Sequence, residues 1–194
     1  MKKHKINFKK NSIMMLALVV IITLGIFLIN ILQDKTETGF KLGGRFLLID
    51  QNEMNFDSKA SKKNKLIYFG YTYCPDVCPF DILKLSKFID QNPKLKKKID
   101  FIFITVDPDR DQPQQLKSFL GNFNPSIIGL TGSKKQVQEV IKKFRIFVKL
   151  HKNSSDDENY LVDHSSLFFL IDKNDQYLTH FTPSDFDSKI NLLL

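Results

Sequence analysis

Glycine and proline are scarce in this sequence. Its 194 residues include eight glycines and seven prolines, too few for a fibrous or a disordered protein. It also lacks internal repeats and low-complexity segments. Hydrophobic residues, by contrast, make up 42% of the chain and include 18 phenylalanines, enough to build a sizeable core. The length therefore indicates one globular domain of ordinary size with an N-terminal extension.

Acidic residues are absent before Asp34. Five of the 29 basic residues precede Asp34, which leaves 24 against 21 acidic residues and a balance of +3 for the rest of the chain. The formal net charge of +8 therefore comes largely from the five lysines of the N-terminus. A mild balance of this kind does not indicate a nucleic-acid-binding domain.

Charged residues are also absent from Ile13–Leu32, a run of 20 residues that is long enough to cross a bilayer as one helix. The lysines before it predict a cytoplasmic N-terminus, with everything after Asp34 on the far side of the membrane. The alternative, a cleaved signal peptide, needs an apolar core of about 7–15 residues that ends in small residues at a cleavage site. Phe27–Leu32 offers no such site, so the sequence favours an uncleaved anchor.

These features predict four segments: a basic tail at 1–12, a transmembrane anchor at 13–32, a tether at 33–45 and a globular domain at 46–194. The simplest placement is a bacterial inner membrane crossed once, with the globular domain in the periplasm. The alternative is a mitochondrial inner membrane with the domain in the intermembrane space. The N-terminus, however, lacks the Arg-rich and Ser-rich character of a transit peptide. An oxidising compartment makes a site with two thiols meaningful.

The two cysteines, Cys74 and Cys78, follow the β-prone run Leu66–Phe69, and each precedes a proline. A residue before proline is disfavoured in the α region, so we expect neither cysteine inside a regular helix. Pro79 suits the first position of a helix, predicted over Pro79–Asn92, with Cys78 as its cap. The positive end of the helix dipole then favours the thiolate of Cys78.

Two structural interpretations of the cysteine pair compete with a functional one. The cysteines are either ordinary buried side chains or a structural disulfide. A disulfide that closes so short a loop constrains the unfolded chain little and stabilises weakly. Buried free cysteines seldom lie in a strand-to-helix loop bracketed by prolines. The spacing thus favours a redox or metal role, although it is not the C-x-x-C of thioredoxins.

The rest of the chain alternates between predicted strands and helices, which indicates an α/β fold with a mixed sheet. Gln51–Asn64 and His151–Asn159 are polar and predicted as loops. The remaining predicted strands are Phe46–Asp50, Ile99–Val106, Ser126–Leu130, Phe147–Leu150, and a hairpin of Leu167–Ile171 with Gln176–Phe181. The remaining predicted helices are Gln114–Phe123, a helix capped by Ser133 that ends near Phe144, and a last helix from Pro183.

This order of elements is typical of a thioredoxin-like fold. From about Gly43 to the C-terminus, the sequence resembles the Sco/SenC proteins of cytochrome c oxidase assembly. Three motifs carry the resemblance, namely Phe69–Pro79, Thr105–Pro113 and Leu161–Ser165, and Phe168–Asp172 with His180–Phe181 resembles the family's closing hairpin. Two departures stand out. Tyr73 occupies a position where many members have histidine, and Lys173–Asp175 lacks the glycine usual in the hairpin turn.

The resemblance implies that Cys74, Cys78 and His164 bind copper. Two thiolates suit Cu(I), and an imidazole lets the same site hold Cu(II). His164 lies just before Leu167–Ile171, and in a thioredoxin-like sheet the start of that strand lies beside the cysteine loop. We expect the other histidines, His4, His151 and His180, to lie outside the site.

Further polar residues near these motifs have two interpretations each. Asp107–Asp111 is either a docking wall for a partner or a structural loop, in which Asp111 caps the next helix and Arg110 pairs with a carboxylate. Asp163, beside His164, is a candidate for orienting the imidazole. Asp76 is expected to form hydrogen bonds within the cysteine loop.

The resulting functional prediction is a membrane-anchored copper chaperone that delivers copper to the binuclear copper site of cytochrome c oxidase subunit II. Other copper chaperones or thiol reductants are further expected partners. The alternative is a thiol–disulfide oxidoreductase that keeps the cysteines of the oxidase reduced. Such enzymes usually carry a cis-proline opposite the cysteine pair, whereas no proline occurs here between Pro125 and Pro183. The motifs of a peroxidase are absent, and a metallochaperone is favoured over an enzyme.

Overall fold

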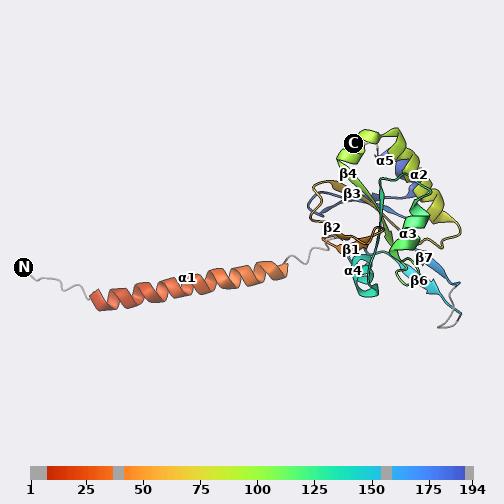
Figure 1. The fold of residues 1–194 in the computed structure, drawn as a ribbon. Coiled ribbons are helices and arrows are strands. Elements are labelled where there is room, and N and C mark those ends of the chain that lie inside the picture. Colours follow the sequence, from red (N-terminus) through yellow and green to blue (C-terminus); the bar gives the residue numbers. More distant parts are fainter. Residues whose placement is uncertain (1–7, 37–41, 154–158, 191–194) are drawn as a thin grey trace, which may run out of the picture. The chain divides into compact units, whose positions relative to one another are not determined.

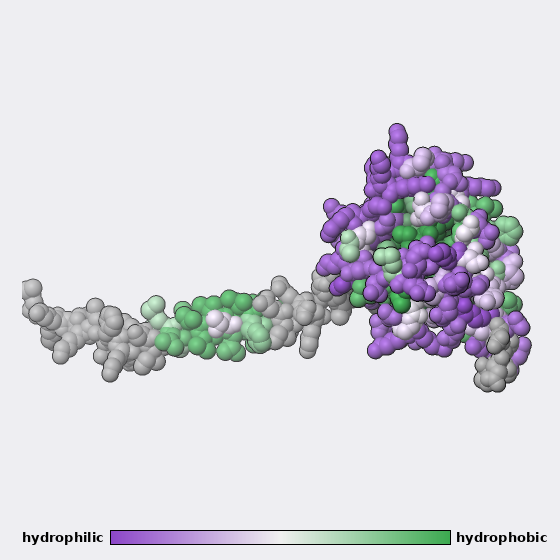
Figure 2. All heavy atoms as spheres, viewed as in Figure 1, coloured by the Kyte–Doolittle hydropathy of each residue, from purple (hydrophilic) through white to green (hydrophobic). Residues whose placement is uncertain are grey.

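The computed structural model describes residues 8–36, 42–153 and 159–190, and the chain divides into two compact units, residues 1–40 and 41–194. The first unit contains one helix, α1 (Phe8–Thr36), whose described side chains are mostly apolar and exposed (Figure 2). Within the described part of the chain, no helix is long and apolar enough to cross a membrane. The predicted transmembrane anchor at 13–32 therefore has no support from the structure.

The second unit is built on a seven-stranded mixed sheet (Figure 1). Its strand order is β2-β1-β5-β4-β3-β8-β9, in which β3, β4 and β5 are parallel and the other neighbours are antiparallel. The strands are β1 (Leu47–Asp50), β2 (Asn55–Asp57), β3 (Asn64–Gly70), β4 (Ile99–Thr105), β5 (Ile127–Thr131), β8 (Phe168–Ile171) and β9 (Tyr177–Phe181). A separate two-stranded sheet pairs β6 (Val148–His151) with β7 (Leu161–His164).

Helices cover both faces of the large sheet. The helices are α2 (Val77–Gln91), α3 (Pro113–Leu120), α4 (Lys134–Phe144) and α5 (Phe186–Ile190), with 3₁₀ turns at η1 (Pro93–Lys97) and η2 (Pro183–Asp185). On one face, Phe119 of α3 packs on Phe103 of β4, and Phe186 of α5 packs on Phe168 of β8 and on α2. On the other face, Phe144 of α4 packs on Phe69 of β3.

The central strands read as apolar runs because the sheet is covered on both faces. All side chains of β3 after Asn64 are buried, and β4 is buried except at Asp100. Side chains alternate along a strand, so Tyr68 faces α2 while Phe69 faces α4. The predicted thioredoxin-like arrangement of a mixed sheet between helices is thus present.

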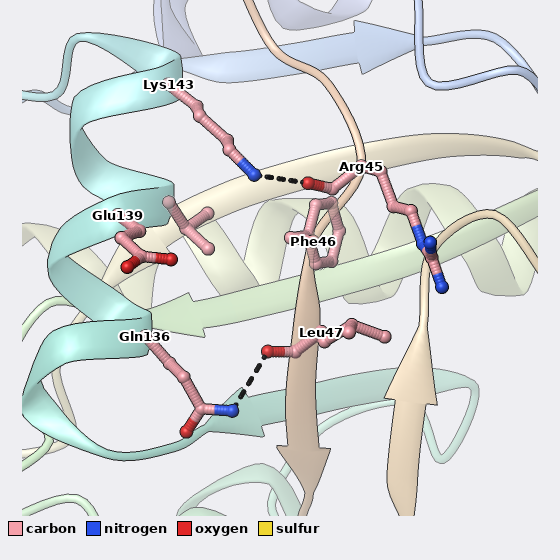
Figure 3. Close-up of a pocket in the computed structure, with 7 residues that line it drawn as sticks. Arg45, Phe46, Leu47, Gln136, Glu139 and Lys143 are labelled. Carbon is pink, nitrogen blue, oxygen red and sulfur yellow. Dashed lines mark hydrogen bonds between the residues drawn. The ribbon is translucent and has the colours of Figure 1, made fainter.

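The chain enters the domain alongside α4 (Figure 3). Lys143 Nζ donates to the carbonyl oxygen of Arg45 at 2.5 Å, and Gln136 Nε2 donates to that of Leu47 at 3.4 Å. The Phe46 side chain between them is buried in the core. A pocket of about 360 Å³ lies between this segment and the helix. Two side chains of α4 thus hold the backbone that leads into β1.

A buried polar network fastens the same segment to the turn between β8 and β9. Phe46 N donates to Ser58 Oγ at 2.9 Å, and Ser58 Oγ donates to Asp175 Oδ2 at 2.9 Å. Asp175 Oδ1 accepts from Lys65 Nζ at 2.9 Å, and both side chains of this ion pair are buried. Asp175 also takes the left-handed position of the turn, with φ of 63°, which glycine usually fills.

Four details of the predicted elements are wrong. Gln51–Asn64 is not all loop, because it contains β2, and β7 was not predicted at all; both are short edge strands with polar residues. Helix α2 begins at Val77, so Cys78 lies inside its first turn and Asp76 is the cap residue. Helix α3 is capped by Gln112 rather than by Asp111. Ser133 caps α4 as predicted, in a capping box with Gln136.

Candidate metal centre

The cysteine loop follows the end of β3 at Gly70. A Cβ on Gly70 would lie 2.8 Å from the ring of Phe103 and 3.1 Å from Cys78 Sγ, so only glycine fits here. The backbone of Cys74 donates to the carbonyl of Tyr71 at 3.3 Å, which turns the chain back towards α2. Cys78, in the first turn of α2, is completely buried beneath the loop, whereas Cys74 is partly exposed.

Cys74, Cys78 and His164 converge at this loop. Their two sulfur atoms and one imidazole nitrogen all lie within 4.8 Å of one another. Cys78 Sγ lies 3.0 Å from His164 Nε2. Both cysteines are free thiols. The structure therefore brings together the three residues that the sequence predicted as ligands, and among the described residues this is the one such group of histidines, cysteines and carboxylates.

The orientation of His164 follows from its place at the end of β7. Its Nδ1 lies 3.2 Å from the carbonyl oxygen of Ser165, which can only accept, so Nδ1 carries the hydrogen. The other ring nitrogen, Nε2, faces Cys78 Sγ. The rings of Tyr68 and Tyr71 meet the imidazole edge to face, with centroids 6.3 Å and 5.9 Å away. The ring is thus held on two sides with its free nitrogen facing the sulfur atoms.

The two thiols have opposite acidities. A hydrogen bond from Cys78 is the largest of the causes that lower the pKa of Cys74 to about 3. The pKa of Cys78 is raised, because ionisation would forfeit that hydrogen bond and because the side chain is buried. The prediction that the helix dipole makes Cys78 the thiolate is therefore wrong. Burial and the neighbouring sulfur outweigh the dipole, and the thiolate is on Cys74.

Asp111 fixes the start of the cysteine loop. Its carboxylate accepts from the backbone N of Thr72 at 3.0 Å and from the hydroxyls of Thr72 and Thr105, both at 2.6 Å. Burial raises the pKa of Asp111. These three bonds explain why Asp111 does not cap α3. The carboxylate points into the protein and joins the loop to the end of β4.

Arg110 forms the predicted ion pair, since its Nε donates to Asp107 Oδ2 at 2.6 Å. Its guanidinium carbon also lies 3.6 Å from the ring centroid of Tyr160 and 4.8 Å from that of Tyr73. Tyr160 in turn donates to Asp107 Oδ1 at 2.6 Å. The loop at 107–111 therefore has a structural role next to the site, where it packs against Tyr73 of the cysteine loop.

A second polar group lies beneath α2. Tyr68 Oη donates to Asp81 Oδ2 at 2.7 Å, and Ser166 Oγ donates to the same oxygen at 2.6 Å. Burial raises the pKa of Tyr68, so its hydroxyl stays protonated. This group joins β3, α2 and the residues that follow His164. No sequence pattern indicated Asp81, Ser166 or Tyr160 as residues near the site. Their one available signal was position, because each lies within a few residues of a predicted ligand motif or of β7.

The remaining sequence predictions are tested by side-chain positions. Asp163 does not orient His164, because neighbours on a strand face opposite sides. It pairs instead with His151, at 2.7 Å between Oδ2 and Nε2. His180 contacts the hydroxyl of Tyr177 and lies outside the site, as does His151, as expected. The side chain of Asp76 forms no capping hydrogen bond. His4 lies outside the described residues.

Known proteins are similar to this chain over the part that contains the cysteine loop and His164. The family model described as SCO1/SenC matches residues 34–191. The SCO2-like protein RP587 of Rickettsia prowazekii is 44% identical over 153 residues, which are 78% of this chain and 73% of that protein. The mitochondrial SCO2 protein of Saccharomyces cerevisiae is 41% identical over 71% of this chain and 46% of its own length.

Solved structures agree with the sequence relatives. The copper-bound structure of ScoI from Bradyrhizobium japonicum superposes with a TM-score of 0.70 and 35% identity, over 79% of this chain and 99% of that one. Yeast Sco1 superposes with a TM-score of 0.70 and 34% identity, over 78% of this chain and 97% of that one. Taken with the cysteine loop and the histidine that faces it, these matches lead to one conclusion: the chain belongs to the SCO1/SenC family.

Proposed function

We propose that this protein binds one copper ion through Cys74, Cys78 and His164 and hands it on during the assembly of cytochrome c oxidase. The observation that carries the proposal is the convergence of two sulfur atoms and one imidazole nitrogen within 4.8 Å. Soft thiolates with one imidazole suit Cu(I) and also accommodate Cu(II). The copper-bound ScoI of Bradyrhizobium japonicum, at 35% identity, supports the choice of metal.

Each residue has a defined part in holding the metal. Cys74 is already a thiolate and is partly exposed, so it is the first ligand that an incoming ion meets. Cys78 must release its proton before its sulfur binds, because its pKa is raised. His164 presents the lone pair of Nε2, since Nδ1 is hydrogen-bonded to the carbonyl of Ser165. Binding therefore releases one proton, from Cys78, at neutral pH.

Delivery requires a partner to reach the site, and we propose subunit II of the oxidase, with its binuclear copper site, as that partner. Three side chains support docking beside Cys74. Val77, Phe80 and Leu83 lie at helical spacing on α2 and are 45%, 67% and 41% exposed. Apolar side chains exposed next to a site are typical of an interaction surface. Exchange of copper from the partly exposed Cys74 to an incoming thiolate is then direct.

We further propose that Ile13–Leu32 anchors the protein in an inner membrane, in the order of segments given above. The support is its sequence, which has no charge over 20 residues and follows five lysines. Carbonate extraction of membranes that contain the full chain tests the anchor. Retention in the membrane pellet is the expected result, and release into the supernatant contradicts it.

A second candidate function is reduction of disulfides, favoured by the pair of free thiols with opposite acidities. The Cys74 thiolate would attack a disulfide of the partner and release one thiolate. The Cys78 thiol would then lose its proton and displace the second thiolate, leaving a Cys74–Cys78 disulfide. Two electrons pass to the partner, whose cysteines become ready to bind copper.

Copper stoichiometry of residues 34–194, reduced and loaded without oxygen, separates the two functions. One copper per domain, lost or much weakened in Cys74→Ala, Cys78→Ala and His164→Ala, is the expected result. His151→Ala and His180→Ala are matched controls and should bind as the parent does. No binding by the parent, together with rapid reduction of a disulfide peptide from the partner, would favour the reductase instead.

A further inference from the structure

The end of the sheet at which the central strands begin lies opposite the metal centre and is strongly basic. The metal centre lies beyond the C-terminal ends of β3 and β4. The other edge, where β3 and β4 begin, carries six lysines that we call the basic edge: Lys59, Lys62, Lys94, Lys96, Lys97 and Lys98. All are exposed or partly exposed. None forms a salt bridge with any residue in the described ranges.

Backbone pairing places these lysines next to one another. Asn64 N donates to the carbonyl of Lys98 at 3.0 Å, so the loop before β3 lies against the end of η1. The parallel register then aligns the first residues of β3 and β4, Asn64 and Ile99. Two of the acidic side chains nearby are already paired with cations, whereas Asp172 accepts hydrogen bonds from its own turn. Asp57 pairs with Arg45 at 2.7 Å, and Asp100 pairs with Lys63 at 3.1 Å.

The chain also enters the domain at this edge. Lys65 pairs with Ile171 across β3 and β8, which puts the turn between β8 and β9 beside the start of β3. Gly43 forms a bridge with Gln176 at that turn. The one acidic group buried there, Asp175, is neutralised by Lys65. The segment that follows the proposed anchor therefore joins the domain beside the basic edge.

The opposite edge carries aspartates where the basic edge carries lysines. Asp76, Asp81, Asp107, Asp109 and Asp111 all lie in or beside the loops that surround the metal centre. Asp107 and Asp109 are paired with Arg110 and Lys134, and Asp111 is buried. A negatively charged surface would therefore attract the basic edge more strongly than the metal edge. This asymmetry orients the domain, which a uniformly basic surface would not do.

We propose that the basic edge docks on the anionic headgroups of a phospholipid bilayer and turns the metal centre away from the membrane. Clustered lysines near a membrane attract anionic lipids through their summed charge. The seven residues of β3 separate the basic edge from the cysteine loop by about 20 Å, at the rise of an extended strand. Docking thus presents the metal site towards partners that project from the same membrane. The proposal does not depend on copper.

Vesicle sedimentation of residues 42–194 tests the proposal. The domain is a fair test object, because residues 41–194 form a compact unit of their own. We expect binding to vesicles of phosphatidylglycerol mixed with phosphatidylcholine and none to phosphatidylcholine alone. Binding should disappear at about 0.5 M salt, where charges are screened beyond a few ångströms.

Two variants of equal net charge locate the surface. Lys62→Glu, Lys94→Glu and Lys97→Glu together reverse charges on the basic edge and should weaken the partition onto anionic vesicles by roughly 100-fold or more. Lys117→Glu, Lys135→Glu and Lys149→Glu together change the charge equally elsewhere and should retain most of the binding. Equal losses in both triples, equal binding to both kinds of vesicle, or no binding at low salt would each overturn the proposal. Copper stoichiometry, unchanged in both triples, verifies that the domains are folded.

Discussion

Cys78 Sγ and His164 Nε2 lie 3.0 Å apart, although 86 residues separate them in the sequence. Cys78 belongs to the first turn of α2 and His164 to the end of β7 in the small sheet. Their contact depends on how the small sheet packs against the large one.

Replacement of Cys78 by alanine should make Cys74 less reactive at acidic pH. The hydrogen bond from Cys78 is the largest cause that lowers the pKa of Cys74 to about 3. In the parent, Cys74 is therefore a thiolate throughout the range from about pH 5 to 7, and iodoacetamide should alkylate it at a nearly constant rate. In Cys78→Ala the pKa rises, so the rate should increase with pH over that range. The same flat profile in the variant would contradict the assigned cause.

Replacement of Asp111 by alanine should destabilise the domain and weaken copper binding. The variant leaves the partly buried backbone N of Thr72 and the buried hydroxyl of Thr105 without their acceptor. We expect a loss of about 1–3 kcal/mol in the free energy of unfolding. Asp109→Ala is the matched control, because it removes only the exposed bridge to Lys134, a loss of about 0–1 kcal/mol. Urea unfolding measures both, and equal losses would exclude a special role for Asp111.

Replacement of Asp175 by asparagine should cost about 3–5 kcal/mol of unfolding free energy, because it leaves the buried charge of Lys65 unpaired. Asparagine tolerates the left-handed backbone that Asp175 adopts, so the change acts on charge rather than on the turn. The double variant Lys65→Met with Asp175→Asn should recover part of the loss. A double variant no more stable than Asp175→Asn would contradict this account. Chemical denaturation is the measurement.

Replacement of Gly70 by alanine should lower both the stability of the domain and its affinity for copper. The new methyl group would press on the Phe103 ring and on Cys78 Sγ, at 2.8 Å and 3.1 Å before relaxation. We expect a loss of about 1–3 kcal/mol in stability from overpacking. We also expect a lower copper affinity, because Cys78 must move. Competition with a Cu(I) chelator measures the affinity, and an unchanged value would show that the sulfur does not shift.

Much of the large sheet could be predicted from the sequence. The nearly continuous apolar runs of β3 and β4 are typical of strands that are covered on both faces. The polar residues Asp172–Asp175 mark the turn between β8 and β9. Strand β2 could not be found in this way. It has three residues, and polar side chains are tolerated there because it is at the edge of the sheet.

The sequence predicted the ligands of the candidate site but not the acidity of its sulfur atoms. The cysteine spacing indicated a redox or metal role, but the inclusion of His164 rested on a family resemblance, since no periodicity indicates β7. The acidity of the two sulfur atoms could not be inferred from local sequence. Cys78 is completely buried in the core, and this burial is a tertiary property that outweighs the helix dipole. Asp111 was misassigned for a similar reason, because its hydrogen-bond donors lie on β4 and in the cysteine loop.

The small sheet of β6 and β7 has a consequence for the chain as a polymer. It carries His164 outside the large sheet, while both cysteines belong to the loop and helix that follow β3. Joint ligation would therefore act as a crosslink that closes a loop of 86 residues between Cys78 and His164. By analogy with a disulfide, such a closure removes about 4–5 kcal/mol of conformational entropy from the unfolded chain. Loading and release of the metal would then tighten and loosen the attachment of the small sheet, which amide hydrogen exchange in β6 and β7 would register.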